Sequence, residues 1–375
     1  MATPDEITRR QELLREAMAA AGYAALVIAG NTEFQQKGYI RYYANWRLYG
    51  GTAFLVLPAM HDPVLVLGLG AQGEWARELS AIADTRTVLD KIGEVTATLN
   101  ACVTPNSRVG VVGLNSIMPY GDAVRLVEAL GQNPIEDATN LVEDIWCVLS
   151  AEDIEAVKCA HADVARIFDA FRAAIRPART EREVVGAAYD VAIRVGCLEG
   201  MIHLNHDNKA GTRPATDRRI DIDDIYKMFM EFMTPDGYLI ELGGCFSFRP
   251  PEQAWLRKHA IVSEAIANAV AMTRPGLVAD DIVSAIRRTY EKAGLEIVGR
   301  RLWDFHGQGM HSILKPFGLP GSTDPIRENM MINIHPGILT ADGLGISATN
   351  NYLVTASGAH VLGDFRHQWH LVGAD

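Results

Sequence analysis

The sequence predicts two domains, an α/β domain over residues 1–147 and an α+β domain over residues 148–375. A chain of 375 residues exceeds the length at which one hydrophobic core normally keeps growing, which favours two cores. Short strand-like runs alternate with helical segments in the first part, whereas long helices and separate strand clusters follow in the second. This change of pattern near residues 146–153 sets the predicted boundary.

In the first domain, the expected strands are short apolar runs bounded by turn residues. These runs are residues 24–30, 52–58, 63–70 and 108–115. The turn sequence His61-Asp62-Pro63 separates the second run from the third. Residues 122–131 have helical spacing and end at Gly131. Strands and helices that alternate in this way are typical of an α/β domain with a largely buried sheet.

In the second domain, four long segments have helical spacing and four shorter runs are β-like. The expected helices are residues 152–175, 183–196, 254–273 and 279–294. The expected strands are residues 228–233, 237–242, 329–339 and 350–358. Ser150 with Asp153, and Thr180 with Glu183, are capping pairs that mark the starts of the first two helices.

Composition and charge exclude several classes of protein. A formal net charge of −11 argues against a general binder of nucleic acid or anionic membrane, because phosphate surfaces would repel it. The five cysteines form no Cys-x-x-Cys pair, so a disulfide framework is not expected and a reducing cytoplasm fits best. No signal peptide and no run of eighteen apolar residues is present, so we expect a cytoplasmic protein without a membrane span.

Ionisable groups gather in four segments of the second domain. These are residues 203–219, 230–242, 303–312 and 332–339. A Pro-Asp-Gly turn between Glu231 and Glu241 predicts a hairpin that brings both carboxylates to one end of a pocket. Glycines beside His306 and His311 allow close approach of the backbone to a ligand, and His335 at the end of an apolar strand needs a partner once buried. Taken singly, each group also fits an ordinary structural role.

The order of these segments resembles the creatinase/prolidase/methionine-aminopeptidase family, also called pita-bread or peptidase M24-like. In that family a hairpin supplies two acids, a Gly-His-Gly-like loop supplies a histidine, Glu-Pro-Gly supplies a glutamate, and a last glutamate precedes a Val-Leu-Val-Thr-type strand. The matching segments here are Gly237-Tyr238-Leu239-Ile240-Glu241, Phe305-His306-Gly307-Gln308-Gly309, His335-Pro336-Gly337 and Tyr352-Leu353-Val354-Thr355. The resemblance implies a creatinase-type N-terminal α/β domain followed by a pita-bread catalytic-type domain.

The residues at the family's metal-ligand positions differ from its usual pattern. Glutamate stands at both hairpin positions, His335 stands in place of a glutamate, and Thr349 or Asn350 occupies the final glutamate position. A two-metal centre is therefore disfavoured. Glu241, His306 and His335 would still suit one Mn, Fe or Zn ion.

The resemblance implies an enzyme that hydrolyses a C–N bond of a small, non-peptide compound, and two mechanisms are open. In the first, no metal takes part, and Glu231 and Glu241 hold a substrate cation or move protons while His306 acts with a second histidine. The candidates for that second histidine are His203, His206 and His311. In the second, Glu241, His306 and His335 bind a single metal for a hydrolase or lyase reaction. A pseudoenzyme that only binds a partner is the third alternative.

The resemblance also implies a homodimer in which the N-terminal domain of one subunit reaches the active site of its neighbour. The residues expected to bind substrate are Arg41, Tyr43, Trp46, Thr212, Arg213 and Asn350. An arginine would suit a carboxylate-bearing substrate, although the aromatic cluster around it could equally pack the first domain. Thr212 stands near the position of the family's substrate-side histidine.

Overall fold

The structure, a computed structural model, divides the chain into two compact units. The first comprises Met1–Trp146 and Met310–Ser312, and the second comprises Cys147–Gly309 and Ile313–Asp375. The described residues are 2–68, 70, 72–197, 199–206, 212–295, 297–300, 304–336, 338–340, 345–346 and 348–373, with the backbone alone at 297–300 and 338–340. Gly337 of the His-Pro-Gly segment lies outside the described residues. The assignment of three residues from position 310 onward to the first unit was not expected from sequence.

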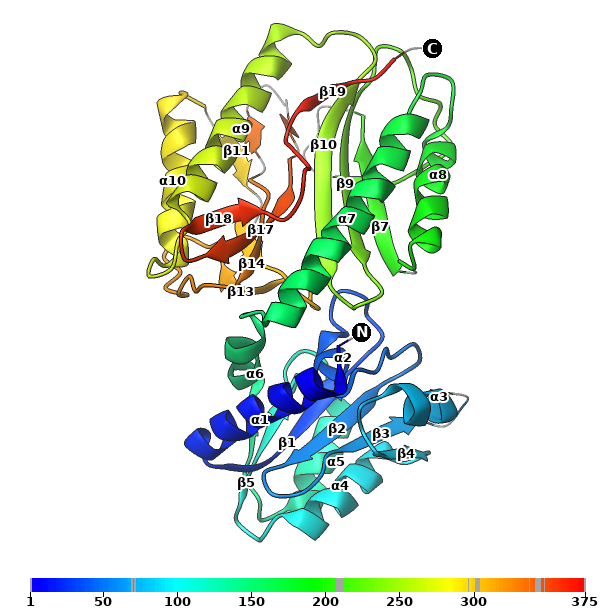
Figure 1. Cartoon of the computed structure of the whole chain (residues 1–375), viewed down its shortest axis with the longest axis vertical. Helices are drawn as coiled ribbons and strands as arrows, with labels where there is room; N and C mark the ends of the chain where they lie inside the picture. Colours follow the sequence, from blue (N-terminus) through cyan, green and yellow to red (C-terminus); the bar gives the residue numbers. More distant parts are fainter. Residues whose placement is uncertain are drawn as a thin grey trace. The chain divides into compact units, whose positions relative to one another are not determined.

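The first unit is built on a six-stranded sheet with the order β4-β3-β2-β1-β5-β6 (Figure 1). Its strands are β1 (Tyr23–Gly30), β2 (Ala53–Pro58), β3 (Val64–Gly68), β4 (Asp84–Val88), β5 (Arg108–Val112) and β6 (Ile135–Asp137). Its helices are α1 (Pro4–Ala21), α2 (Gly38–Ala44), α3 (Gln72–Leu79), α4 (Lys91–Cys102), α5 (Tyr120–Leu130) and α6 (Thr139–Trp146). Six consecutive residues of β1 are buried, which requires cover on both faces of the sheet.

The second unit contains two five-stranded sheets and one small three-stranded sheet. The first sheet has β7 (Glu199–Asn205), β8 (Arg213–Pro214), β9 (Ile225–Met233), β10 (Leu239–Ser247) and β19 (Trp369–Leu371). The second has β12 (Phe305–Gly307), β13 (Leu314–Phe317), β14 (Met331–Ile334), β17 (Asn350–Thr355) and β18 (Gly358–Val361). The small sheet has β11 (Ile297–Arg300), β15 (Ile338–Thr340) and β16 (Gly345–Ile346).

Four long helices cover these sheets (Figure 1). They are α7 (Ala151–Ala174), α8 (Glu181–Arg194), α9 (Gln253–Met272) and α10 (Ala279–Lys292). Both predicted capping pairs form: Ser150 with Asp153 starts α7, and Thr180 with Glu183 starts α8. The predicted class, an α/β domain followed by an α+β domain, is therefore confirmed. None of the helices described here is long and apolar enough to cross a membrane.

The two faces of β10 have different neighbours. Phe246 packs against Phe168 and Phe171 of α7, with ring centroids 5.7 and 5.3 Å apart, so the even-numbered side chains face the helices. The odd-numbered side chains face β17, because Gly243 forms a β-bridge with Thr349. A Cβ atom on Gly243 would lie only 2.8 Å from the Thr349 methyl carbon, so the close approach of the sheets requires glycine there.

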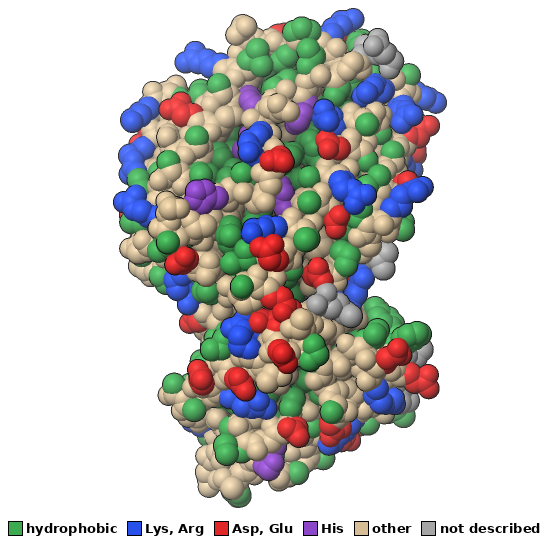
Figure 2. Space-filling view, viewed as in Figure 1, with side chains coloured by type: hydrophobic (Ala, Val, Ile, Leu, Met, Phe, Trp, Pro, Cys, Tyr) green, Lys and Arg blue, Asp and Glu red, His purple; other side chains and the backbone are tan. Residues whose placement is uncertain are grey.

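Acidic and basic side chains are interspersed over the face of each unit shown in Figure 2. A broad basic stripe, which is the usual footprint of a nucleic-acid binder, is not visible on that face.

His311 belongs to an aromatic cluster of the first unit. Its ring centroid lies 4.4 Å from that of Tyr39 and 4.6 Å from that of Trp146, and the next residue, Ser312, donates its backbone N–H to Gln35. Burial lowers the pKa of His311 to about 3. The ring is therefore neutral at pH 7 and behaves as a packed aromatic side chain.

Replacement of His311 by glutamine is expected to reduce the pH dependence of stability. The unfolded chain takes up a proton at this histidine near pH 6.5, whereas the folded chain does so only near pH 3, so stability is lost as the pH falls below about 6.5. Between pH 7.5 and pH 5, this group should lower the free energy of unfolding by about 2 kcal/mol. Urea denaturation at both pH values checks this. The exposed His61 provides the control: His61→Gln should keep the full pH dependence, and equal slopes in all three proteins would contradict the assignment.

Candidate functional site

Two buried glutamates face each other across the β9–β10 hairpin. Glu231 stands directly opposite Glu241 in the antiparallel register, as the Pro-Asp-Gly turn predicted. Their exposed fractions are 0% and 3%. Directly opposed residues of an antiparallel pair have Cβ atoms about 5 Å apart, so the two carboxylates share one region.

A row of polar side chains on the second sheet completes this region. His306 of β12 pairs with Asn333 of β14, which in turn pairs with Asn351 of β17, so the three side chains lie on one face. His335 follows β14 two residues after Asn333 and is also buried. The apolar residues between them on these strands are buried on the opposite face, which is why a polar row can form without breaking the core.

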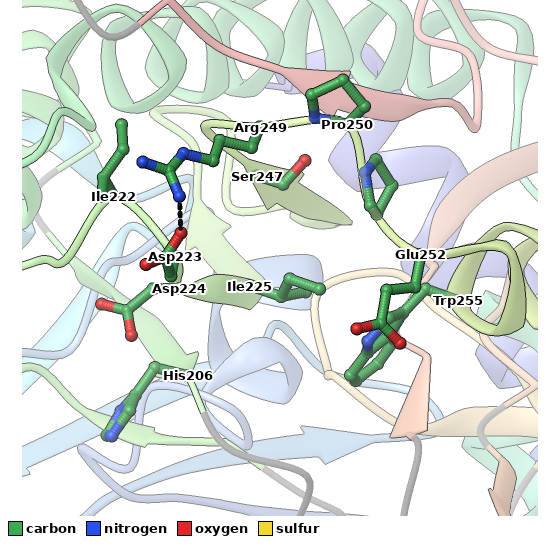
Figure 3. Close-up of a pocket in the computed structure, with 11 residues that line it drawn as sticks. His206, Ile222, Asp223, Asp224, Ile225, Ser247, Arg249, Pro250, Glu252 and Trp255 are labelled. Carbon is green, nitrogen blue, oxygen red and sulfur yellow. Dashed lines mark hydrogen bonds and ion pairs between the residues drawn. The ribbon is translucent and has the colours of Figure 1, made fainter.

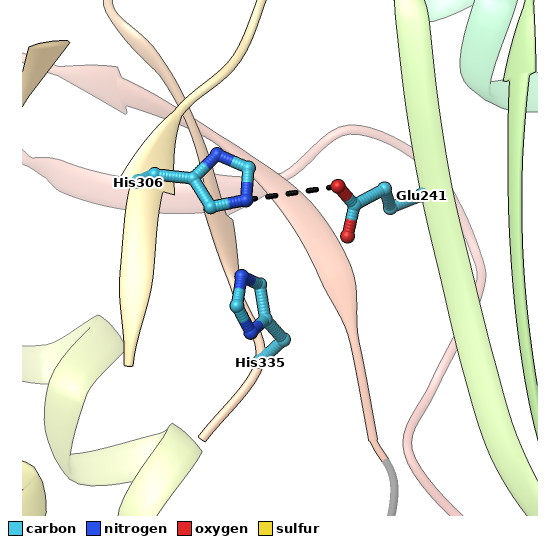
Figure 4. Close-up of side chains that lie close together, drawn as sticks. All are labelled: Glu241, His306 and His335. Carbon is cyan, nitrogen blue, oxygen red and sulfur yellow. Dashed lines mark ion pairs between the residues drawn. The ribbon is translucent and has the colours of Figure 1, made fainter. Parts of the chain in front are cut away.

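Glu241, His306 and His335 converge closely enough to hold a metal ion (Figure 4). One ligand atom from each residue lies within 4.8 Å of the others, and the Nε2 atom of His306 is 3.6 Å from a carboxylate oxygen of Glu241. The imidazole ring centroids are 4.9 Å apart. Two histidines and one carboxylate are a common ligand set for a single transition-metal ion.

The orientation of the His306 ring identifies the atom available to a ligand. Its Nδ1 atom lies 2.9 Å from the backbone carbonyl of Gly307, which can only accept a hydrogen bond, so Nδ1 carries the hydrogen. In the neutral ring the lone pair is then on Nε2, which points at the carboxylate of Glu241. A lone pair facing a carboxylate needs a cation or a proton between them. A histidine whose second nitrogen is held by a backbone carbonyl is typical of metal ligands.

An ordered chain of amide hydrogen bonds supports the two glutamates. The backbone N–H of Glu241 donates to Oδ1 of Asn351 over 2.9 Å, and Nδ2 of Asn351 donates to Oε1 of Gln308. The Nε2 atom of Gln308 donates to Glu231 over 3.0 Å and to Glu241 over 3.1 Å. Because a backbone N–H can only donate, it fixes the orientation of Asn351 and, through it, that of Gln308.

Position 349 contributes a hydroxyl to this region, whereas position 350 does not contribute to it. Thr349 is buried and donates its hydroxyl hydrogen to Oδ1 of Asn333 over 2.8 Å. The side chain of Asn350 lies on the other face of β17, where it contacts His161 at 2.9 Å and donates to the carbonyl of Phe365. Of the two candidates for the final glutamate position, Thr349 is therefore the one on the side of Glu241.

The two histidines upstream of the hairpin have different surroundings. Register places Met201 beside Glu231 and His203 beside Phe229, so His203 lies on the same face as Glu231, about 7 Å further along the strand. Burial lowers the pKa of the half-buried His203, which favours its neutral form. His203 is thus the upstream histidine on the side of the glutamate pair.

His206 and Arg213 belong to another cluster, around the buried carboxylate of Glu181. Arg213 forms two hydrogen bonds to this carboxylate, at 3.0 and 3.2 Å, and His206 lies 3.6 Å from it. Burial is the main cause that lowers the pKa of His206. Thr212 directly precedes Arg213 at the edge of the sheet. The structure therefore does not bring His206 and Arg213 to Glu241, and a role of Thr212 in substrate binding stays a prediction.

His206 also lines a pocket of about 460 Å³ at the ends of β9 and β10 that lie away from their connecting turn (Figure 3). Ile225 and Ser247, which pair at those ends, also line it. Ser247 is six positions after Glu241 on β10, which corresponds to about 20 Å along the strand. The pocket is therefore distinct from the region around Glu241.

Three of the residues predicted to bind substrate lie in the first unit. Arg41, Tyr43 and Trp46 have exposed fractions of 7%, 0% and 3%. Tyr43 packs edge-on against Tyr42, and Trp46 lies against Tyr49. These contacts show that the aromatic cluster packs the first unit, and a role in substrate binding stays a prediction.

Comparison with known proteins places the chain in a family. Residues 155–356 match the model of metallopeptidase family M24. The chain therefore belongs to metallopeptidase family M24, and the resemblance to pita-bread enzymes is confirmed. The predicted enzyme class, a hydrolase of C–N bonds, agrees with this membership.

Three relatives match this chain over nearly its whole length. The chain is 25% identical to "Probable dipeptidase PepE" of Mycobacterium tuberculosis, over 96% of this chain and 95% of the relative. It is 28% identical to "Agropine synthesis cyclase" of Rhizobium rhizogenes, over 96% of each. It is 24% identical to "Ectoine hydrolase" of Halomonas elongata, over 98% and 97%. Dipeptidase PepE from Mycobacterium ulcerans has the same fold, with a TM-score of 0.83 at 23% identity over 99% of both chains.

Sequence reasoning did not assign a role to Gln308, Asn333 or Asn351. All three are buried, and Gln308 and Asn351 hold the carboxylate pair through the amide chain. Gln308 was visible only as one letter of the His306 loop. A sequence feature that could have drawn attention to them is their position: each is a polar residue within or directly beside an apolar strand.

Replacement of Asn351 by alanine is expected to destabilise the second unit by about 1–3 kcal/mol. The change leaves the buried N–H of Glu241 and the carbonyl oxygen of Gln308 without their partner. Thermal or urea unfolding measures the loss. Ser357→Ala, at an exposed turn after β17, should stay within about 0.5 kcal/mol of the original protein. Equal stability of the two variants would show that the amide chain is not needed.

Proposed function

We propose that this protein hydrolyses a C–N bond of a small polar compound at a single-metal site formed by Glu241, His306 and His335. The observation that carries the proposal is the convergence of these three buried groups within 4.8 Å. Burial of a carboxylate beside two imidazoles costs free energy unless a cation or protons balance the cluster, which favours a functional site. Two histidines and one carboxylate leave coordination positions for water and substrate.

The protein's own residues would each have a defined task. A divalent ion bound to the three groups would polarise the scissile bond and lower the pKa of a bound water. The carbonyl of Gly307 keeps Nε2 of His306 aimed at the ion position, and Gln308 keeps the carboxylate of Glu241 in place. His203, neutral and on the same face as Glu231, is the candidate to move a proton between water and the leaving nitrogen.

The choice of a small, non-peptide substrate rests on the relatives and on the altered site. One relative over nearly the whole length is an ectoine hydrolase, and another is an agropine synthesis cyclase. The residues here do not fit the two-metal centre of the family, because Thr349 is neutral and Gln308 donates to both hairpin glutamates. Dipeptides are the alternative substrate class, because one relative is described as a probable dipeptidase. Turnover of ectoine, simple amides and ureas, compared with dipeptides, distinguishes the two classes.

A metal-free mechanism is the second candidate, and one observation favours it. Nε2 of His306 and the carboxylate of Glu241 are 3.6 Å apart, a separation that also suits an imidazolium–carboxylate ion pair. In that case His306 would donate a proton to the leaving nitrogen while Glu231 and Glu241 hold the substrate. Activity that persists in excess chelator would favour this mechanism.

The cytoplasmic location and the homodimer are further parts of the proposal. Free cysteines, three of them buried, suit a reducing compartment. The family resemblance implies that Arg41 binds substrate in the active site of the partner subunit. If so, dilution below the dimer dissociation constant should lower specific activity. Sedimentation and activity measured over the same concentration range test this together.

Replacement of His335 by alanine is expected to abolish tight metal binding and to lower kcat by at least about a hundredfold. The reason is that only Glu241 and His306 of the ligand set remain. Metal content of the purified protein, measured by inductively coupled plasma mass spectrometry, gives a readout independent of activity. His367→Ala, at a half-buried histidine that contacts the hydroxyl of Tyr352, is the matched control and should retain the metal. Full activity of a metal-free His335→Ala protein would refute the single-metal site.

Replacement of His203 by glutamine is expected to lower kcat by about 10²–10⁴ with the metal content unchanged. The matched control is His206→Gln, three residues away. His206 lies beside Glu181, whereas His203 lies on the face of the sheet that carries Glu231. That control should lose less than about tenfold in activity. Steady-state kinetics measure kcat on a substrate identified by the comparison of ectoine, amides, ureas and dipeptides. A larger loss of kcat in His206→Gln than in His203→Gln would assign the proton transfer to His206 instead.

A further inference from the structure

We propose that the side-chain amide of Gln308 takes the place of one of the two metal ions of the family, between Glu231 and Glu241. The inference deepens the proposed function, because it depends on the same pair of hairpin glutamates. It assigns to Gln308 a task that a divalent cation performs elsewhere: holding two buried carboxylates together.

The first argument is the geometry of the amide nitrogen. Nε2 of Gln308 has two hydrogens, and it donates to one oxygen of Glu231 over 3.0 Å and to one oxygen of Glu241 over 3.1 Å. A single donor atom therefore bridges both carboxylates, as a bridging cation would. A metal ion bound to the same two oxygens would lie close to this nitrogen, so the two occupants exclude each other.

The second argument is that the amide cannot simply rotate to present its oxygen. Rotation would bring the carbonyl oxygen of Gln308 against two carboxylates and would place its NH₂ group against the NH₂ group of Asn351. Asn351 cannot rotate to compensate, because its Oδ1 atom accepts from the backbone N–H of Glu241. The backbone thus fixes a donor between the glutamates, and donors repel cations.

The third argument concerns the remaining ligand of that position. Thr349 is a neutral residue that bonds to Asn333. A cation between the glutamates would therefore lack a third anionic ligand from this strand. Gln308 is not itself a member of the set formed by Glu241, His306 and His335, which stays available for one ion.

The test replaces Gln308 by glutamate, which keeps the size of the side chain and exchanges its donor for an acceptor. Original protein and Gln308→Glu are incubated with Mn²⁺ at pH 8 and desalted, and the ions per chain are counted by mass spectrometry. We expect Gln308→Glu to hold one more Mn²⁺ per chain than the original protein. Mn²⁺ should also raise the melting temperature of Gln308→Glu by several degrees more than that of the original protein.

Gln308→Met is the control, because it removes the donor and adds no charge. It should not gain an ion, and it should melt at a lower temperature because both buried carboxylates lose a donor. Circular dichroism verifies that each variant is folded before the ions are counted.

The outcomes separate this inference from the proposed function. One ion in the original protein and two in Gln308→Glu support both. No ion in the original protein and one in Gln308→Glu support the role of Gln308 and remove the single-metal mechanism. Two ions in the original protein, or equal numbers in the original protein and Gln308→Glu, overturn the role of Gln308 whatever the catalytic mechanism is.

Discussion

The hydrogen bond from the backbone N–H of Glu241 to Asn351 is the constraint on which the arrangement of the site depends. A backbone N–H has one possible role, so it sets the direction of every amide hydrogen bond that follows. This series of hydrogen bonds ends at Gln308, whose two amide hydrogens are donated to the two hairpin carboxylates. The amide of Gln308 is thereby fixed as the hydrogen-bond donor, and the carboxylates of Glu231 and Glu241 are fixed as the acceptors. Low polarity of the buried surroundings strengthens these bonds and penalises any alternative arrangement.

The close packing of two sheets makes this hydrogen bond possible. Gly243 lets β17 approach β10 closely, and the bridge to Thr349 fixes the register between strands that lie more than a hundred residues apart. Alternation along each strand then directs polar side chains into the space between the sheets and apolar ones toward the helices. The same alternation explains why Asn350 and Asn351, although adjacent, have different tasks.

The chain has retained the fold of family M24, and we propose that its site has been altered. In this proposal the amide of Gln308 fills the family's metal position between the hairpin acids, whereas Glu241, His306 and His335 keep the chemistry of a ligand set. A neutral donor balances less charge than a divalent ion. The expected consequence is a narrower range of reactions than two ions allow, which agrees with a small C–N substrate.

The sequence by itself determined the two-domain class, the long helices with their capping pairs, and the hairpin that joins Glu231 to Glu241, because spacing, caps and turn residues are local properties. It also indicated His306 and His335 through the order of motifs. Only the tertiary structure decided which histidine lies beside the glutamates and that Gln308 bridges them. Those facts depend on strand register and on the packing of sheets far apart in sequence, and the composition of a single segment carries no information about either. For the same reason His311, three residues after Gln308, could not be assigned from sequence to the aromatic cluster of the first unit.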